Sequence, residues 1–242
     1  MCAGDCLHLW WVALILLAIH VLFVTAMVLA PGILIVRKGG YDHRRWGKIY
    51  FWCWTGIAFL VLLLRIHEPF NGPSMMAVGV FYIAFTGRRS LYHKSSVEKA
   101  TWLDWAGIAF AIAFGLALFF HGLTDFRLYL NRFEIVVGLL CLVLARFEIW
   151  DLLRPRDDPR SWLFKHMRNM LVSFVGGISI VVFVTMQFLP NYVYLSLPWL
   201  IGLPAVAGWM HYYRRKHGGE SWIGMPARSP ATNAIGDVGN AS

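Results

Sequence analysis

The sequence has 242 residues, of which 58% are hydrophobic and only 14% are charged. Soluble domains usually carry about 25% charged residues, so the composition excludes an ordinary soluble protein. The net charge of +9 could suggest a nucleic-acid partner, but the basic residues lie in alternate connections between apolar segments. That placement is a signal of membrane topology, and we expect no nucleic-acid binding.

Seven apolar segments are candidates to cross a bilayer, which takes about 20 helical residues. In chain order they are expected over Leu7–Val36, Trp46–Ile66, Ser74–Thr86, Trp102–Phe120, Arg132–Leu153, Ser161–Leu189 and Tyr192–Tyr213. The sequence therefore predicts an all-α, polytopic membrane protein with a seven-helix transmembrane domain over residues 1–216. Residues 217–242 are rich in Gly, Pro, Ala and Ser and have no apolar periodicity, which predicts a disordered cytoplasmic tail.

The basic residues predict which side of the membrane each connection faces. Nineteen of the 22 Lys and Arg residues lie near the first, third and fifth connections or after the seventh segment. The other three are Arg65, Arg127 and Arg132. Because positive connections stay on the cytoplasmic side, the N-terminus is expected outside and the C-terminus in the cytoplasm.

The first connection, Arg37–Tyr50, is expected as a basic loop in which Gly39 permits a tight turn. Positive and imidazole side chains at headgroup level can bind lipid phosphate or another anion. The candidates are Lys38, His43 and Arg44 here, and His166 and Arg168 at the start of the sixth segment. A role as topology anchors only is the alternative for these residues.

Two carboxylates close to predicted helix starts have the spacing of capping boxes. Asp104 follows Thr101 by three residues, and Glu134 follows Asn131 by three residues. Such carboxylates accept hydrogen bonds from the first backbone amides of a helix, so we expect capping ahead of catalysis or proton transfer. Further along, Glu148 and Asp151 are expected to form local ion pairs with Arg146 and Arg154.

Histidines supply candidate ligand residues. His20 lies well inside the first segment, where an ionisable group is costly and is by default a functional candidate. His67 and His121 fall near the outer ends of two segments and could be axial ligands of a haem b. A structural or interfacial role for these histidines stays open, because no segment carries the pair of histidines that stacks two haems across a bilayer.

The N-terminus carries thiols and an imidazole, Cys2, Cys6 and His8, which could bind zinc or copper. No further cluster completes a set of four ligands, so a disulfide or free thiols are the alternatives. Cys53 and Cys141 lie in apolar segments and are expected to be small buried hydrophobes. The sequence has no phosphate-binding loop, nucleophile elbow, zinc-protease or dinucleotide motif, and we expect no enzyme activity.

One pattern runs through several segments of the chain. It consists of Ile19-His20, Lys38-Gly39, His43-Arg44 with Gly47, Tyr50, and much later the basic helix start Lys165–Met170. This series of an Ile-His pair, Lys-Gly, His-Arg-x-x-Gly and an aromatic residue resembles the pattern of a bacterial family of predicted membrane proteins of unknown function. The resemblance covers about residues 19–95 and 160–190 and implies a bacterial inner membrane, but no activity.

We expect the chain to be a non-catalytic binding, sensing or accessory subunit of a membrane complex, with the lipid bilayer and membrane proteins as its partners. The small connections leave no room for a soluble domain. A haem b electron-transfer protein is one alternative. A small transporter is another, because His20 would lie in a polar core and because residues 54–59 faintly repeat residues 105–110, each starting with Trp.

Overall fold

The computed structural model describes residues 3–64, 72–93, 100–124, 130–153 and 160–217. Within these ranges the chain is helical, without strands. The helices are α1 (Ala3–Ile35), α2 (Tyr41–Leu64), α3 (Gly72–Arg89) with the 3₁₀ turn η1 (Ser90–Tyr92), α4 (Trp102–Thr124), α5 (Leu130–Leu153), α6 (Ser161–Thr185) and α7 (Asn191–His217). Five of them, α1, α2, α4, α6 and α7, are long and apolar enough to cross a membrane. The architecture is that of a multi-pass membrane protein.

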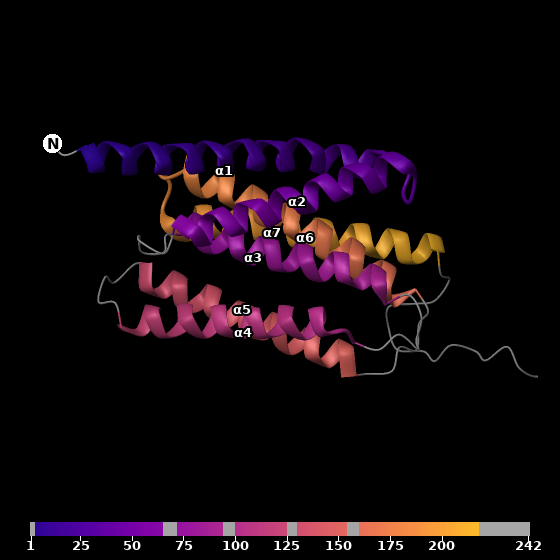
Figure 1. The fold of residues 1–242 in the computed structure, drawn as a ribbon. Coiled ribbons are helices and arrows are strands. Elements are labelled where there is room, and N and C mark those ends of the chain that lie inside the picture. Colours follow the sequence, from indigo (N-terminus) through magenta and orange to yellow (C-terminus); the bar gives the residue numbers. More distant parts are fainter. Residues whose placement is uncertain (1–2, 65–71, 94–99, 125–129, 154–159, 218–242) are drawn as a thin grey trace, which may run out of the picture.

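The helices run alternately up and down a single bundle (Figure 1). α1 lies along one side and the α4–α5 pair along the opposite side, with α3 and α6 between them. α3 is the most enclosed helix, since it packs against α2, α4, α5 and α6. Its buried residues include Met75 and Val78, which lie in the main core with Trp54 and Ile57 of α2.

We call the basic end the end of the bundle where α1, α3, α5 and α7 finish and where α2, α4 and α6 begin (Figure 1). The described Lys and Arg residues lie at or near this end, apart from Arg132 in the first turn of α5. The grouping agrees with the charge bias of the sequence. Small residues let the helices approach closely. On α6, Ser173 is fully buried, and Gly177 packs against Met27 and Trp54.

Several boundaries differ from those expected. α2 begins at Tyr41 rather than Trp46, so His43 and Arg44 lie in its first turns and not in a loop. The tight turn is confirmed at Gly39, which has a φ of +75°. α1 continues through Pro31 to Ile35, and α6 ends at Thr185 rather than Leu189. The expected tail lies outside the described residues, except for His217, which ends α7.

Candidate functional site

Polar side chains gather where α3 and α6 cross at the basic end. His166 of α6 donates its Nδ1–H to the carbonyl of Gly87 on α3, at 2.8 Å. One turn further into the bundle, Asn169 Nδ2 donates to Thr86 Oγ1 at 2.9 Å. Gly87 makes this crossing possible, because a Cβ added there would lie only 2.9 Å from the Cβ of Asn169. The close approach allows both helices to satisfy polar groups that are buried away from water.

A second histidine belongs to the same region. His43 of α2 donates its Nδ1–H to the carbonyl of Ile33, at 3.3 Å, near the end of α1. Lys38 Nζ donates to the carbonyl of Leu34 at 2.7 Å and so caps the same helix end. Partial burial lowers the pKa of Lys38 below the ordinary lysine value.

The hydrogen bonds of these two histidines determine which ring nitrogen is the donor and which is the acceptor. Because a carbonyl oxygen only accepts, each neutral ring carries its proton on Nδ1 and keeps Nε2 as an acceptor. This is the tautomer in which a histidine binds metal ions or accepts a proton from a ligand. Among the described residues, however, no group of three or more His, Cys, Asp or Glu side chains could hold a metal ion.

The expected anion-binding set is thus placed at one end of the bundle, on the α1–α2 turn, α2 and α6. Lys38, His43 and His166 each spend a donor on a backbone carbonyl. Arg168 donates from Nε to Asn169 Oδ1 at 3.1 Å, and Arg44 is exposed. Binding of a lipid phosphate or another anion by this set stays a prediction.

A second polar cluster joins α3 to α4, and Asp104 is its centre. Arg89 binds this carboxylate with two nitrogens, Nε at 2.8 Å and Nη2 at 3.0 Å. Thr101 donates both its backbone N–H and its hydroxyl to Asp104 Oδ2 at 2.8 Å, which confirms the expected cap. His93 Nε2 lies 3.2 Å from the same oxygen. The sequence patterns predicted the cap but missed Arg89.

The carboxylates at the end of α5 are also paired across helices. Lys165 of α6 lies 2.6 Å from Glu148 Oε2 and 3.2 Å from Asp151 Oδ2. The expected pairing of Glu148 and Asp151 with Arg146 was wrong, because both carboxylates pair with Lys165 of α6 instead. Arg154 lies outside the described residues. A cavity of about 20 Å³, room for about one water molecule, lies between these residues and Asp104.

His20 does not lie in a polar core. It is exposed on the outer side of α1, and its Nδ1 donates to the carbonyl of Leu16 at 2.7 Å. The expectation of a histidine-containing core was therefore wrong. The reason is that α1 is apolar on every side, so its sequence marks no inward face. The faint repeat gains no support either, since Trp54 is fully buried and the corresponding Trp105 is 45% exposed.

At the opposite end of the bundle, His121 of α4 pairs with Glu134 of α5. Its Nδ1 lies 2.7 Å from Glu134 Oε2; the carboxylate side chain is 4% exposed and the imidazole 45%. The expected cap of Glu134 with Asn131 lies outside the described side chains, and the contact of Glu134 with α4 was not predicted. His67, the expected partner of His121 at a haem, lies outside the described residues. The structure describes no side chain before Trp10, so the N-terminal site of Cys2, Cys6 and His8 also lies outside.

Two expected features and two that the sequence patterns did not predict complete the picture of the described residues. Cys53 and Cys141 are buried free cysteines, as expected. Tyr50 and Ser173 form a buried hydrogen bond of 2.9 Å between α2 and α6. The sequence patterns passed over Asn169, although an amide in the apolar part of a helix is a signal for a buried hydrogen bond.

A comparison with known protein families, with curated proteins and with solved structures finds no match to this chain. A function is therefore argued from the geometry of the site alone.

Proposed function

We propose that the chain is a bacterial inner-membrane protein that crosses the bilayer seven times, and that it serves as a non-catalytic accessory subunit of a membrane complex. Its N-terminus would lie outside and its basic end in the cytoplasm, as the bias of positive residues favours. The polar clusters at the basic end support a structural rather than a catalytic role, because their donors are spent on carbonyls and carboxylates of neighbouring helices.

The observation that carries the proposal is the exposure of His20. The apolar part of α1 spans Trp10–Ile35, and His20 lies ten residues from its start, about 15 Å along the helix axis. This depth is well inside the hydrocarbon layer, which is about 30 Å thick. Ionisable residues at such depth normally face other helices rather than lipid. An outward-facing His20 therefore calls for a partner helix that covers it.

The chemistry of that partner follows from the hydrogen bond to Leu16. Since Nδ1 donates to a carbonyl, Nε2 of the neutral ring is left as an acceptor facing outward, without a partner among the described residues. A transmembrane helix that presents a hydrogen-bond donor, such as Ser, Thr or Asn, would satisfy it at a gain of about 1 kcal/mol. The surrounding Leu17 and Val24, both exposed, would supply apolar contact area.

Photo-crosslinking in native membranes tests the proposal. A photoreactive amino acid at Leu17 or Val24 should give one discrete adduct with the same protein, identified by mass spectrometry, and His20→Leu should strongly reduce its yield. The matched control is the same probe at Val136, an exposed apolar position of α5 on the other side of the bundle.

Two results would contradict the proposal. One is that the α1 probes label only lipid. The other is that the adduct forms equally well in His20→Leu, because His20 would then contribute nothing to association. Co-expression of two differently tagged copies separates a complex with another protein from self-association, which would replace the accessory role with a homo-oligomer.

A haem protein is the second candidate, favoured by the His121–Glu134 pair. A buried carboxylate that accepts the Nδ1–H of a histidine orients the ring and leaves Nε2 for a metal. In this alternative His121 would be one axial ligand and His67 the other. The visible spectrum of protein expressed with ample haem is the test: a Soret band that disappears in His121→Ala supports the alternative, and its absence from the unmodified protein excludes it.

A further inference from the structure

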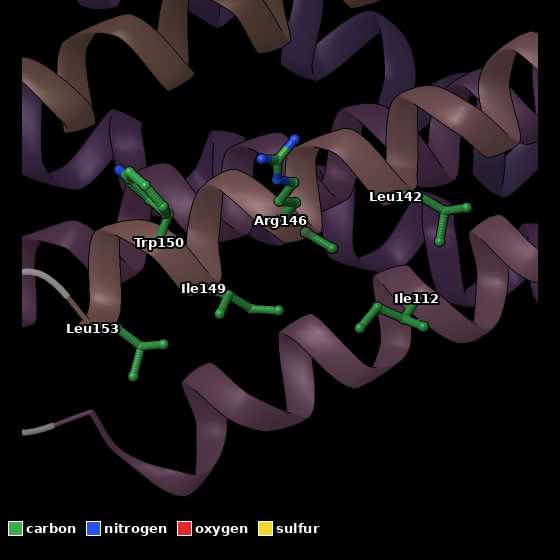
Figure 2. A pocket seen from close by; sticks show the side chains of 7 residues that line it. Ile112, Leu142, Arg146, Ile149, Trp150 and Leu153 are labelled. Carbon is green, nitrogen blue, oxygen red and sulfur yellow. The ribbon is translucent and has the colours of Figure 1, made fainter.

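A groove of about 580 Å³ runs along the outer face of α5, where α4 lies beside it (Figure 2). Its walls are apolar except for one side chain. The lining residues are Ile112 of α4 and Leu142, Ala145, Arg146, Ile149, Trp150 and Leu153 of α5. The α5 residues recur every three or four positions, so they form one continuous stripe on the helix surface.

Arg146 is the charged group of this groove. Figure 2 shows its guanidinium and the Trp150 ring on the same side of α5, with Ile149 and Leu153 on the side of the groove nearer α4. The nearby carboxylates Glu148 and Asp151 are both occupied by Lys165. Arg146 itself has no ion pair or hydrogen bond in the part of the chain that the structure describes.

In the proposed seven-helix arrangement, in which α5 crosses the membrane, the depth of Arg146 matches a membrane interface. It lies seven residues before Leu153, the last residue of α5, which corresponds to about 10 Å along the helix axis. A long arginine side chain can reach from this depth to the phosphate level, and tryptophan is enriched at the same level. Deeper in the groove, Leu142 and Ile112 offer apolar surface where an acyl chain would lie.

We propose that this groove is a binding site for one anionic phospholipid, with its phosphate on Arg146 and Trp150 and an acyl chain along Leu142 and Ile112. Charge complementarity selects this occupant: an unpaired guanidinium in an apolar groove needs an anion, and a phospholipid supplies the anion together with the chain that fills the groove. A guanidinium binds phosphate with two parallel hydrogen bonds, and in phosphatidylcholine the positive charge of the choline group offsets the charge of that phosphate, so an anionic phospholipid is favoured.

The test is lipid retention by the full-length protein in nanodiscs that contain equal amounts of phosphatidylglycerol and phosphatidylcholine with the same acyl chains. After extraction into mild detergent, native mass spectrometry counts the lipid that stays bound. We expect the unmodified protein to retain phosphatidylglycerol in preference to phosphatidylcholine. In Arg146→Gln the ratio of retained phosphatidylglycerol to phosphatidylcholine should fall by roughly fivefold, the effect of one basic residue near the membrane surface.

Two variants separate a specific site from general attraction. Arg45→Gln removes the same charge from the basic end at an exposed position outside the groove, and should leave the preference unchanged. Leu142→Trp narrows the groove while keeping Arg146, and should release the bound lipid. Arg146 is exposed and unpaired, so Arg146→Gln should fold normally, which the thermal melt of the protein verifies.

Four outcomes would overturn the proposal. These are equal retention of the two lipids by the unmodified protein, an unchanged preference in Arg146→Gln, release of the lipid by millimolar inorganic phosphate alone, and an equal loss of preference in Arg45→Gln. Release by phosphate would show that the site binds an anion without needing the acyl chain. Equal loss in both variants would show that the preference comes from the overall positive charge of this end of the bundle and not from the groove.

Discussion

Asp104 is a buried carboxylate that holds the end of α3 against the start of α4. Its side chain is 5% exposed, and its two oxygens accept hydrogen bonds from Nε and Nη2 of Arg89 and from the backbone amide and hydroxyl of Thr101. A charge at such a site is stable only while its partners remain, because removal of one partner leaves the other charge buried and uncompensated. Asp104 is therefore the single residue whose loss should cost the most stability at the basic end.

We expect Asp104→Asn to lower the free energy of unfolding by about 3 kcal/mol, the typical cost of breaking a buried ion pair from one side. The amide keeps the size of the carboxylate, so the change isolates the charge. Thermal or denaturant unfolding of the purified protein in detergent measures the effect.

Asp42→Asn is the matched control for this substitution. Asp42 also lies in the first turn of a helix, α2, but it is exposed and has no ion pair or hydrogen bond with a described residue. Its only contribution is to the helix dipole, so the loss should stay below about 1 kcal/mol. Equal losses in the two variants would show that Arg89 contributes nothing to the stability of Asp104.

Sequence patterns named many of the polar residues at the basic end but not their pairings. His43 and His166 were predicted as candidates for headgroup or anion binding, and the structure shows that each donates a hydrogen bond to a backbone carbonyl of a neighbouring helix, Ile33 of α1 and Gly87 of α3. Tyr50 and Ser173 are 123 residues apart in the chain and share a hydrogen bond. Such pairings depend on how helices pack, which local spacing does not encode. The direction that a side chain faces is likewise not encoded by hydropathy, as the exposed His20 shows.

At the scale of elements, α4 and α5 form the closest helix pair of the bundle through two facing glycines. A Cβ added at Gly138 would lie 2.7 Å from the carbonyl oxygen of Gly115, and one added at Gly115 would lie 2.9 Å from the carbonyl oxygen of Gly138. The contacts are with backbone atoms, which cannot move aside like a flexible side chain. Close approach of small residues is a main source of helix association in a membrane.

Gly138→Ala should therefore destabilise the protein by about 1–3 kcal/mol, the usual cost of an added methyl group in a tightly packed site. The added methyl group should also push α4 and α5 apart. That would expose the thiol of Cys141, which is buried beside Gly115 in the unmodified protein. Faster reaction of this thiol with a membrane-permeant maleimide, measured in Gly138→Ala with the other three cysteines replaced by serine, would report that opening.

The same substitution at Gly79 of α3 is the control. No atom lies within 4 Å of a Cβ added at this position, and the backbone is helical. Alanine is favoured over glycine in a helix by up to about 1 kcal/mol, so Gly79→Ala should leave stability unchanged or raise it. A loss in Gly79→Ala as large as that in Gly138→Ala would contradict the role assigned to the glycine contact.

Helix existence was more predictable than helix ends. All seven expected segments contain a helix in the described residues, because a long apolar run has few other ways to satisfy its backbone in lipid. The start of α2 was placed five residues too late, at Trp46, because hydropathy marks the membrane boundary and a helix can continue beyond it. α1 passes through Pro31 because neighbouring helices and local adjustments tolerate proline in apolar helices.

At the scale of the whole molecule, the open question is how many helices cross the membrane. α3 and α5 are not among the five helices that are long and apolar enough to cross a membrane: α3 has only 18 residues, and α5 has 24 residues but carries Arg132, Glu134, Arg146, Glu148 and Asp151. The bundle explains why both can still span. α3 is enclosed by four helices and needs little apolar surface of its own, and its 18 residues cover about 27 Å. The carboxylates of α5 are paired, Glu134 with His121 and Glu148 with Lys165, which lowers the cost of their burial.

Seven and five crossings make different predictions between α3 and α5, although both are odd and give the two termini the same sides. With seven, residue 93 lies in the cytoplasm and residue 124 outside; with five, without α3 and α5, the two positions are exchanged. Alkaline phosphatase, active only outside, and green fluorescent protein, fluorescent only inside, fused after residues 93 and 124, therefore decide between them. We expect fluorescence from the fusion after residue 93 and phosphatase activity from the fusion after residue 124, because Arg88 and Arg89 at the end of α3 belong with the other basic residues. The reverse pattern would require α4 to cross in the direction opposite to α2 and α6, and it would contradict the bundle, in which these three helices begin at the same end.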